Sequence, residues 1–134
     1  MSWLSDRDYN YIYSRATRIC VDLVIKTDDG VFMIKRDEQP YKGKYHLPGG
    51  RIRFRENILK AIRRIAKTEI GCNVVIGTLL GFMDFPKEIQ YGNKRHSMSL
   101  AFLVSPLEKI DVKKIDVKKI HPVHYKFLRS IKYL

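Results

Sequence analysis

The chain has 134 residues, 45% of them hydrophobic, and its 26 Lys and Arg residues against 14 Asp and Glu give a formal net charge of +12. This length and apolar content predict a single domain, residues 1–134, with a core of its own. No apolar run approaches the roughly 18–20 residues of a membrane span, and the N-terminus does not resemble a signal peptide, so we expect a cytoplasmic protein. Two cysteines exclude a disulfide framework.

The positive charge indicates attraction to phosphates, whether they belong to a nucleotide, an RNA or a membrane surface. Much of the excess is lysine in residues 109–119 and near the C-terminus, where a biased composition alone can produce it. The sequence has no RNA-binding signature of interleaved basic and aromatic residues. Nucleic acid therefore stays an alternative partner that we do not favour.

The N-terminal segment predicts a short amphipathic helix over residues 5–15. Ser5 is a capping residue, and Tyr9, Ile12 and Tyr13 follow at helical spacing. The aromatic side of this helix must be covered, either by its own subunit or by a second one.

Two strands joined by a hairpin are predicted over residues 18–26 and 31–35, because both are rich in Val, Ile, Phe and Met and flank an Asp-Asp-Gly turn. Asp22 interrupts the first strand, where aspartate is disfavoured. It lies either on the solvent face or at a ligand. Arg36 ends the second strand.

A glycine loop and a helix follow, and the rest of the chain is interpreted around them. The loop contains Gly49 and Gly50, and the apolar residues of 58–66 recur at helical spacing before Gly71, a typical C-terminal glycine. On a helical wheel Glu69 lies within the apolar face, so its carboxylate is predicted to point inward, toward a metal ion or an arginine such as Arg51. Arg36 and Arg51 can both grip phosphate oxygens, which favours a diphosphate clamp.

His46 precedes the glycine loop and is interpreted as a packed histidine. Residues 74–82 predict one or two strands, residues 84–95 a polar loop, and residues 97–104 a further strand. Tyr91 in the loop is a candidate for stacking on a base or a sugar.

The C-terminal part contains two copies of Lys-Ile-Asp-Val-Lys within residues 109–118, interpreted as a solvated, extended connection. A loop with His121 and His124 follows, then a predicted strand over residues 125–128. The final residues 129–134 are expected to form at most a helical turn.

The spacing of Gly50, Glu56, Arg64, Glu69 and Gly71 resembles the Nudix box, here residues 50–72. Two positions inside the box depart from the family pattern, because Ile65 and Thr68 replace two of its usual clustered glutamates. The same replacement resembles the GDP-mannose mannosyl hydrolase branch, and the similarity covers most of residues 4–105.

This resemblance implies the Nudix fold, an α/β/α sandwich with a mixed β-sheet, and a homodimer formed with the N-terminal helix. It implies Mg²⁺, with Mn²⁺ as an alternative, bound by Glu69 and a backbone carbonyl near Gly49. It also implies that Asp22 contacts the nucleotide or a neighbouring arginine, and that Arg64 pairs with Glu56 in a structural role.

The activity implied is hydrolysis of a nucleoside diphosphate sugar such as GDP-mannose at its glycosyl C–O bond. A histidine of the 121–124 loop, with His121 preferred over His124, would take a proton from water near neutral pH. Two alternatives are a pyrophosphohydrolase that cleaves a P–O bond and a Nudix-fold module that binds a nucleotide or RNA without turnover.

Overall fold

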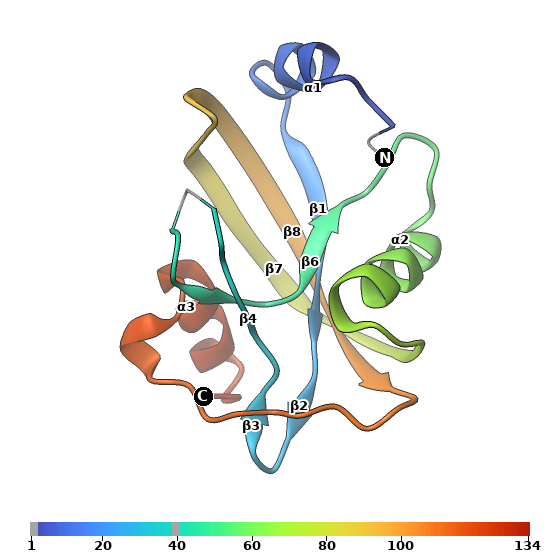
Figure 1. Ribbon diagram of the computed structural model, residues 1–134, viewed down its shortest axis with the longest axis vertical. Coiled ribbons are helices and arrows are strands. Elements are labelled where there is room, and N and C mark those ends of the chain that lie inside the picture. Colours follow the sequence, from blue (N-terminus) through green and yellow to red (C-terminus); the bar gives the residue numbers. More distant parts are fainter. Residues whose placement is uncertain (1–2, 39–40) are drawn as a thin grey trace.

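A central four-stranded sheet forms the middle layer of the protein in the computed structural model, which describes residues 3–38 and 41–134 (Figure 1). The strand order is β6-β1-β8-β7, with β1 parallel to β8 and the other neighbouring pairs antiparallel. The sheet is therefore mixed, as expected. The strands are β1 (Arg18–Val24), β6 (Gly49–Arg51), β7 (Val74–Gln90) and β8 (Asn93–Pro106).

Helices cover both faces of this sheet, giving the α/β/α sandwich. Strand β1 alternates its side chains between the two faces. Val21 and Leu23 pack against Ile62 and Ile65 of helix α2 (Ile58–Ile65). Val24 faces the other side, in a core that includes residues of helix α3 (Pro122–Ser130). Asp22 and Val24 are two residues apart in β1, so their side chains lie on the same face of the sheet, and the Asp22 carboxylate lies on the face away from α2.

Each helix begins at a residue that can satisfy the free N–H groups of its first turn. Helix α1 (Asp6–Tyr13) is capped by Ser5, whose hydroxyl accepts from the N–H of Asp8, and α2 is capped by Asn57. The predicted N-terminal helix is thus present. A short 3₁₀ helix, η2 (Val117–Lys119), follows the extended 109–116 connection.

Two small ribbons flank the main sheet. Strands β2 (Lys26–Thr27) and β3 (Gly30–Val31) form the hairpin predicted at the Asp-Asp-Gly turn. Strands β4 (Ile34–Lys35) and β5 (Tyr45–His46) form the second ribbon; Gln39 and Pro40, which are not among the predicted site residues, lie outside the described residues.

The polar loop predicted over residues 84–95 is wrong, because β7 and β8 continue as one long hairpin through this region. Tyr91 and Gly92 form its two-residue turn, both with positive φ, 51° and 75°, as such tight hairpins require. The less exposed positions of this stretch include polar residues, among them Glu88, Gln90 and the buried Arg95. This part of the hairpin therefore lacks the alternation of apolar and polar residues that predicts a strand.

The strand predicted over residues 125–128 is also wrong, since these residues lie in the middle of α3. His121 is the N-cap and Pro122 the first helical residue, a position that suits proline because its missing N–H has no helical partner. The closing helix thus begins seven residues earlier than the short terminal turn expected at residues 129–134. Among the described residues, no helix is long and apolar enough to cross a membrane.

Candidate active site

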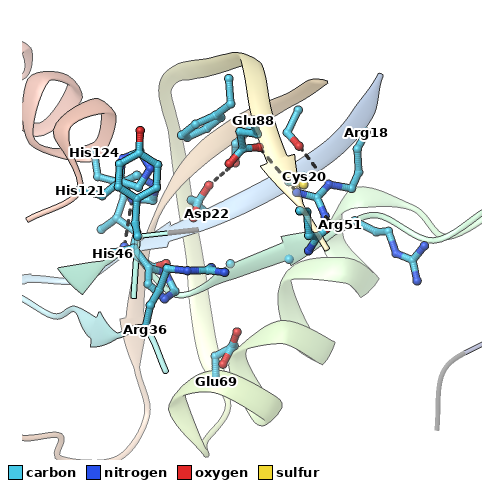
Figure 2. Close-up of a pocket in the computed structure, with 18 residues that line it drawn as sticks. Arg18, Cys20, Asp22, Arg36, His46, Arg51, Glu69, Glu88, His121 and His124 are labelled. Atoms are coloured by element: carbon cyan, nitrogen blue, oxygen red, sulfur yellow. Dashed lines mark hydrogen bonds and ion pairs between the residues drawn. The ribbon is translucent and has the colours of Figure 1, made fainter. Parts of the chain in front are cut away.

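A cavity of about 240 Å³ opens between the sheet, the end of the box helix and the start of α3 (Figure 2). Most of the residues predicted to act at a site line it. These are Asp22, Arg36, Gly49, Gly50, Arg51, Glu69, His121 and His124. The cavity is also lined by Arg18, Cys20, His46, Glu88, Ser97 and Ser99, which the sequence did not single out as site residues.

Glu69 reaches the cavity from an irregular end of the box helix. Helix α2 passes directly into a π-helical turn, η1 (Ala66–Ile70), which ends at Gly71 in the left-handed region with φ 91°. Burial raises the pKa of the half-buried Glu69 carboxyl, and the positive charge of Arg36 opposes this rise. In Figure 2 Glu69 approaches the cavity from the α2 side.

The two unusual positions of the box offer no carboxylate near Glu69. Ile65 is buried in the core, and the Thr68 hydroxyl donates to the carbonyl of Arg64 at 3.0 Å. Glu56 is engaged elsewhere, because Arg64 donates to both of its oxygens at 2.8 and 2.9 Å. Glu69 is thus the box carboxylate that lines the cavity.

Asp22 lies at the floor of the cavity with 7% of its surface exposed. Ser99 Oγ, on the neighbouring strand β8, donates a hydrogen bond to Asp22 Oδ2. Burial raises the pKa of Asp22 to about 7; the Ser99 hydrogen bond lowers it, and Glu88 and Glu69 raise it further. Its side chain is therefore buried in the cavity floor rather than on the solvent face, and its hydrogen-bond partner is Ser99 rather than an arginine.

Arg51 extends from the glycine loop toward the N-terminal segment and is half-buried there. Its guanidinium carbon lies 5.0, 4.8 and 5.4 Å from the ring centroids of Trp3, Tyr9 and Tyr13. Such contacts favour a cation over the ring faces. Among the residues that the structure describes, Arg51 Nη1 is buried without a hydrogen-bond acceptor. The aromatic side of α1 is therefore covered within its own chain, and one Arg51 donor is available to an anion.

An ion pair on the hairpin side of the cavity joins Arg18 Nη2 and Glu88 Oε1 at 3.8 Å. Arg18 is further fixed by Nε donating to Ser97 Oγ at 3.0 Å and by contacts to Tyr9 and Gln90. Within the described part of the chain, Glu88 Oε1 is buried without a hydrogen-bond donor. It is therefore an acceptor suited to a cation.

Three histidines occupy the opposite wall of the cavity, beside Arg36 (Figure 2). The ring centroids of His121 and His124 are 4.9 Å apart, and those of His46 and His124 are 6.1 Å apart. Burial lowers the pKa of all three rings, that of His121 to about 4 and that of His124 well below its usual range. His46 therefore lines the cavity, contrary to the interpretation of a simply packed ring.

Tyr91 does not line this cavity. It is 67% exposed at the β7–β8 turn, where its hydroxyl donates to Glu38 at 3.2 Å. The structure thus separates Tyr91 from the other predicted substrate contacts.

The carboxylates that line the cavity suit a metal ion that is also coordinated by a phosphate of the ligand. In residues 3–38 and 41–134, no three His, Cys, Asp or Glu side chains converge closely enough to enclose a metal ion by themselves. Glu69 and Glu88, whose Oε1 receives no hydrogen bond within the described residues, nevertheless face one cavity with Asp22, and their carboxylates raise its pKa. Mg²⁺ is commonly bound by one or two carboxylates together with substrate phosphates and water, so these residues fit that ion.

Family comparison identifies the class of the protein. Residues 16–127 match the NUDIX domain, so the chain belongs to the Nudix family. Among curated proteins, the chain is 28% identical over 105 residues to the low-salt glycan biosynthesis protein Agl8 of Haloferax volcanii, covering 76% of this chain and 67% of that protein. It is 33% identical over 86 residues to an ADP-ribose pyrophosphatase of Methanocaldococcus jannaschii, covering 64% of this chain but only about half (49%) of that protein.

Solved structures agree on the fold. A MutT Nudix hydrolase from Burkholderia pseudomallei superposes with a TM-score of 0.65 at 20% identity, covering 90% of this chain and 99% of that one. A MutT protein from Methanosarcina mazei gives 0.66 at 18% identity, with coverages of 87% and 93%. The predicted Nudix fold is confirmed.

Proposed function

We propose that this Nudix protein hydrolyses a nucleoside diphosphate sugar of the GDP-mannose type at the glycosyl C–O bond, releasing the free sugar and a nucleoside diphosphate. The observation that carries the proposal is the division of the cavity. Glu69 and Arg51 line one part, and a wall of neutral histidines with Arg36 beside it lines another. A cation-binding region beside a neutral, partly apolar wall suits a diphosphate joined to a sugar.

The diphosphate is held by the basic residues of the cavity. Arg36 and Arg51 donate hydrogen bonds to its oxygens. Arg51 Nη1 suits this role because, among the described residues, it is buried without an acceptor. Glu69 and the main chain at Gly49 would hold Mg²⁺, which when bound supplies positive charge to the departing diphosphate. Asp22 and Ser99 form the floor beneath Gly49 and keep the glycine loop close to the sheet.

Attack at the anomeric carbon rather than at phosphorus is favoured because the box lacks two of its usual carboxylates. Ile65 and Thr68 provide no carboxylate that could take a proton from water near the diphosphate. The histidine wall lies next to Arg36, which also lowers the pKa of His46 and His121. A sugar attached to a phosphate held by Arg36 extends toward these rings. Water that attacks its anomeric carbon from the histidine side inverts the configuration at that carbon.

A sugar-containing substrate is also favoured by the relative from Haloferax volcanii, whose name refers to glycan biosynthesis. The second candidate function is P–O cleavage by a pyrophosphohydrolase. It is favoured by the relative named ADP-ribose pyrophosphatase and by Glu88, which adds a carboxylate with one buried oxygen to the same cavity. The third candidate, a binding module without turnover, rests on the depleted box and the positive net charge.

The proposal includes a single Nudix domain acting as a cytoplasmic homodimer. Tyr9 and Tyr13 of α1 face their own chain, but Tyr11 and Ile12 on the same helix are exposed. These two side chains are the surface that a second subunit would cover. Sedimentation of the wild type and of Ile12→Asp would test this part, because a dimer formed through α1 dissociates in the variant.

Product analysis tests the proposed reaction. The protein is incubated with GDP-mannose and other nucleoside diphosphate sugars in the presence of Mg²⁺ or Mn²⁺, and the products are resolved by phosphorus and proton NMR. We expect nucleoside diphosphate and a free sugar whose first-formed anomer is inverted. Nucleoside monophosphate and sugar phosphate would establish the pyrophosphohydrolase instead, and tight binding without any product would establish the binding module.

A further inference from the structure

The backbone of one residue, Leu47, fixes the tautomers of two histidines in opposite ways. Its N–H donates to His124 Nδ1 at 3.0 Å, and its carbonyl oxygen lies 2.7 Å from His46 Nδ1. A carbonyl oxygen only accepts hydrogen bonds, so His46 must carry a proton on Nδ1, whereas His124 Nδ1 must be bare. Leu47 is completely buried, so water does not compete for either bond.

The third ring follows the pattern of His124. The N–H of Val123, in the first turn of α3, donates to His121 Nδ1 at 3.1 Å. A neutral His121 or His124 therefore carries its proton on Nε2 and presents a donor there. A neutral His46 has a bare Nε2 and presents an acceptor.

We propose that His46 Nε2 is the proton acceptor for the attacking water, and that His121 and His124 act through their Nε2–H groups as hydrogen-bond donors. This assignment rests on the proposed hydrolysis of a nucleoside diphosphate sugar. It differs from the expectation that a histidine of the 121–124 loop is the base, because the Nε2 atoms of those two rings already hold protons.

The step balances with residues already in the cavity. Water oxygen bonds to the anomeric carbon as the bond from that carbon to the phosphate oxygen breaks, and the bonding electron pair leaves on the diphosphate. His46 Nε2 takes a proton from the water and becomes an imidazolium whose Nδ1–H stays bonded to the Leu47 carbonyl. The proton returns to solvent after the products leave.

The surroundings of His46 keep the ring neutral and oriented. Burial and the positive charge of Arg36 lower its pKa, against the opposing effect of the Leu47 carbonyl. The ring is therefore in its acceptor form at neutral pH. A buried backbone partner on one ring nitrogen leaves the other directed to the reacting groups, which is how histidine bases are commonly oriented.

The tautomers can be tested without substrate. Nitrogen NMR of the ¹⁵N-labelled protein at pH 7.5 should show His46 as the Nδ1–H tautomer and both His121 and His124 as Nε2–H tautomers. Single His→Gln variants assign the three resonances. An Nε2–H tautomer for His46 overturns the proposal, whatever the substrate proves to be.

The catalytic role is tested with His46→Ala, using His96→Ala as the matched control because His96 is half-exposed and outside the cavity lining. We expect kcat of His46→Ala to fall roughly 10²–10⁴-fold, the range of general base catalysis, with nucleoside diphosphate affinity within about threefold of wild type. Added imidazole should restore at least about tenfold of the loss, and His96→Ala should match the wild type.

A kcat within about threefold of wild type, or a loss that imidazole does not restore, overturns the assignment. Failure of the proposed function looks different, since the wild-type protein itself would then release nucleoside monophosphate or no product. The NMR tautomers separate the two cases, because they are measured in the absence of any turnover.

Discussion

Arg64 donates to both carboxylate oxygens of Glu56, from Nε at 2.8 Å and from Nη2 at 2.9 Å, and Nη2 also donates to the carbonyl of Arg51 at 2.9 Å. Glu56 in turn accepts from the N–H of Arg53 at 3.1 Å. These bonds connect helix α2 to the loop that follows β6. The position of Arg51 in the cavity therefore depends on an ion pair that lies outside it.

Glu56→Gln should lower the free energy of unfolding by about 1–3 kcal/mol at pH 7, because Arg64 loses its charged partner while one amide oxygen remains to accept. The hydrogen bonds from Arg64 hold the pKa of Glu56 below its usual range. This stabilisation is present above the unfolded-state pKa and is lost as pH falls through the lower folded-state value. Urea unfolding at pH 7 and pH 3.5 measures the difference between variant and wild type.

The exposed Glu108→Gln is the control for this prediction, and it should unfold like the wild type at both pH values. The account of the ion pair would be contradicted if Glu56→Gln were as stable as wild type at pH 7, or if the loss were the same at pH 3.5.

The free energy of unfolding of Asp22→Asn should increase relative to that of the wild type as pH rises. The pKa of Asp22 in the folded protein is about 7, above the value near 4 expected for the unfolded chain. Because this folded-state pKa is raised, the contribution of protonated Asp22 to stability is fully present below pH 4 and is lost as pH rises toward and past 7. The difference in unfolding free energy between variant and wild type should therefore shift by about 1–3 kcal/mol in favour of the variant between pH 4 and pH 8.

Thermal unfolding of Asp22→Asn and of Ser99→Ala across this range checks the assignment. Ser99→Ala removes the hydrogen bond that lowers the Asp22 pKa, so its unfolding free energy should fall more steeply with pH than that of the wild type. Parallel pH profiles of Asp22→Asn and the wild type would show that Asp22 titrates normally.

The box could be predicted from the sequence because its signals are local. The helix start, the glycine stop and the inward direction of Glu69 all follow from spacing within one short segment, and the structure has each of them. The histidine wall could not be predicted in this way. Leu47 and His124 are 77 positions apart, and they meet because β5 pairs with Ile120 just before α3.

The missed elements also have physical reasons. The part of the β7–β8 hairpin on either side of its turn has Glu88, Gln90 and Arg95 at its less exposed positions, where an apolar residue is the usual signal. Helix α3 did carry a signal, since Pro122 suits a first helical residue and Val123 and Phe127 are four residues apart.

Gly49→Ala should destabilise the protein by about 1–3 kcal/mol, the usual cost of overpacking. A Cβ on Gly49 would collide with Asp22 Oδ1 and lie 2.8 Å from the carbonyl oxygen of Val21. The neighbouring Gly50→Ala is the matched control, because its Cβ would meet Ile65 at 3.4 Å. Urea unfolding should show a clear loss for Gly49→Ala and a smaller one for Gly50→Ala; equal losses would contradict the close approach of Asp22.

Arg51→Lys should weaken binding of a nucleoside diphosphate by about tenfold or more, since lysine cannot reproduce two parallel N–H donors. Arg63→Lys, on the exposed side of α2, serves as the control and should bind like the wild type. Isothermal titration with GDP and Mg²⁺ measures both. Unchanged affinity in Arg51→Lys would mean that the aromatic rings of the N-terminal segment, rather than a phosphate, are the functional partner of this arginine.

The most direct test of the central claim is hydrolysis of GDP-mannose with Mg²⁺ in ¹⁸O-labelled water, followed by phosphorus NMR and mass analysis of the products. Attack at the anomeric carbon predicts that the label is in the sugar and that the released GDP is unlabelled. Label in a phosphate, with GMP among the products, would contradict the account and assign the cavity to P–O cleavage.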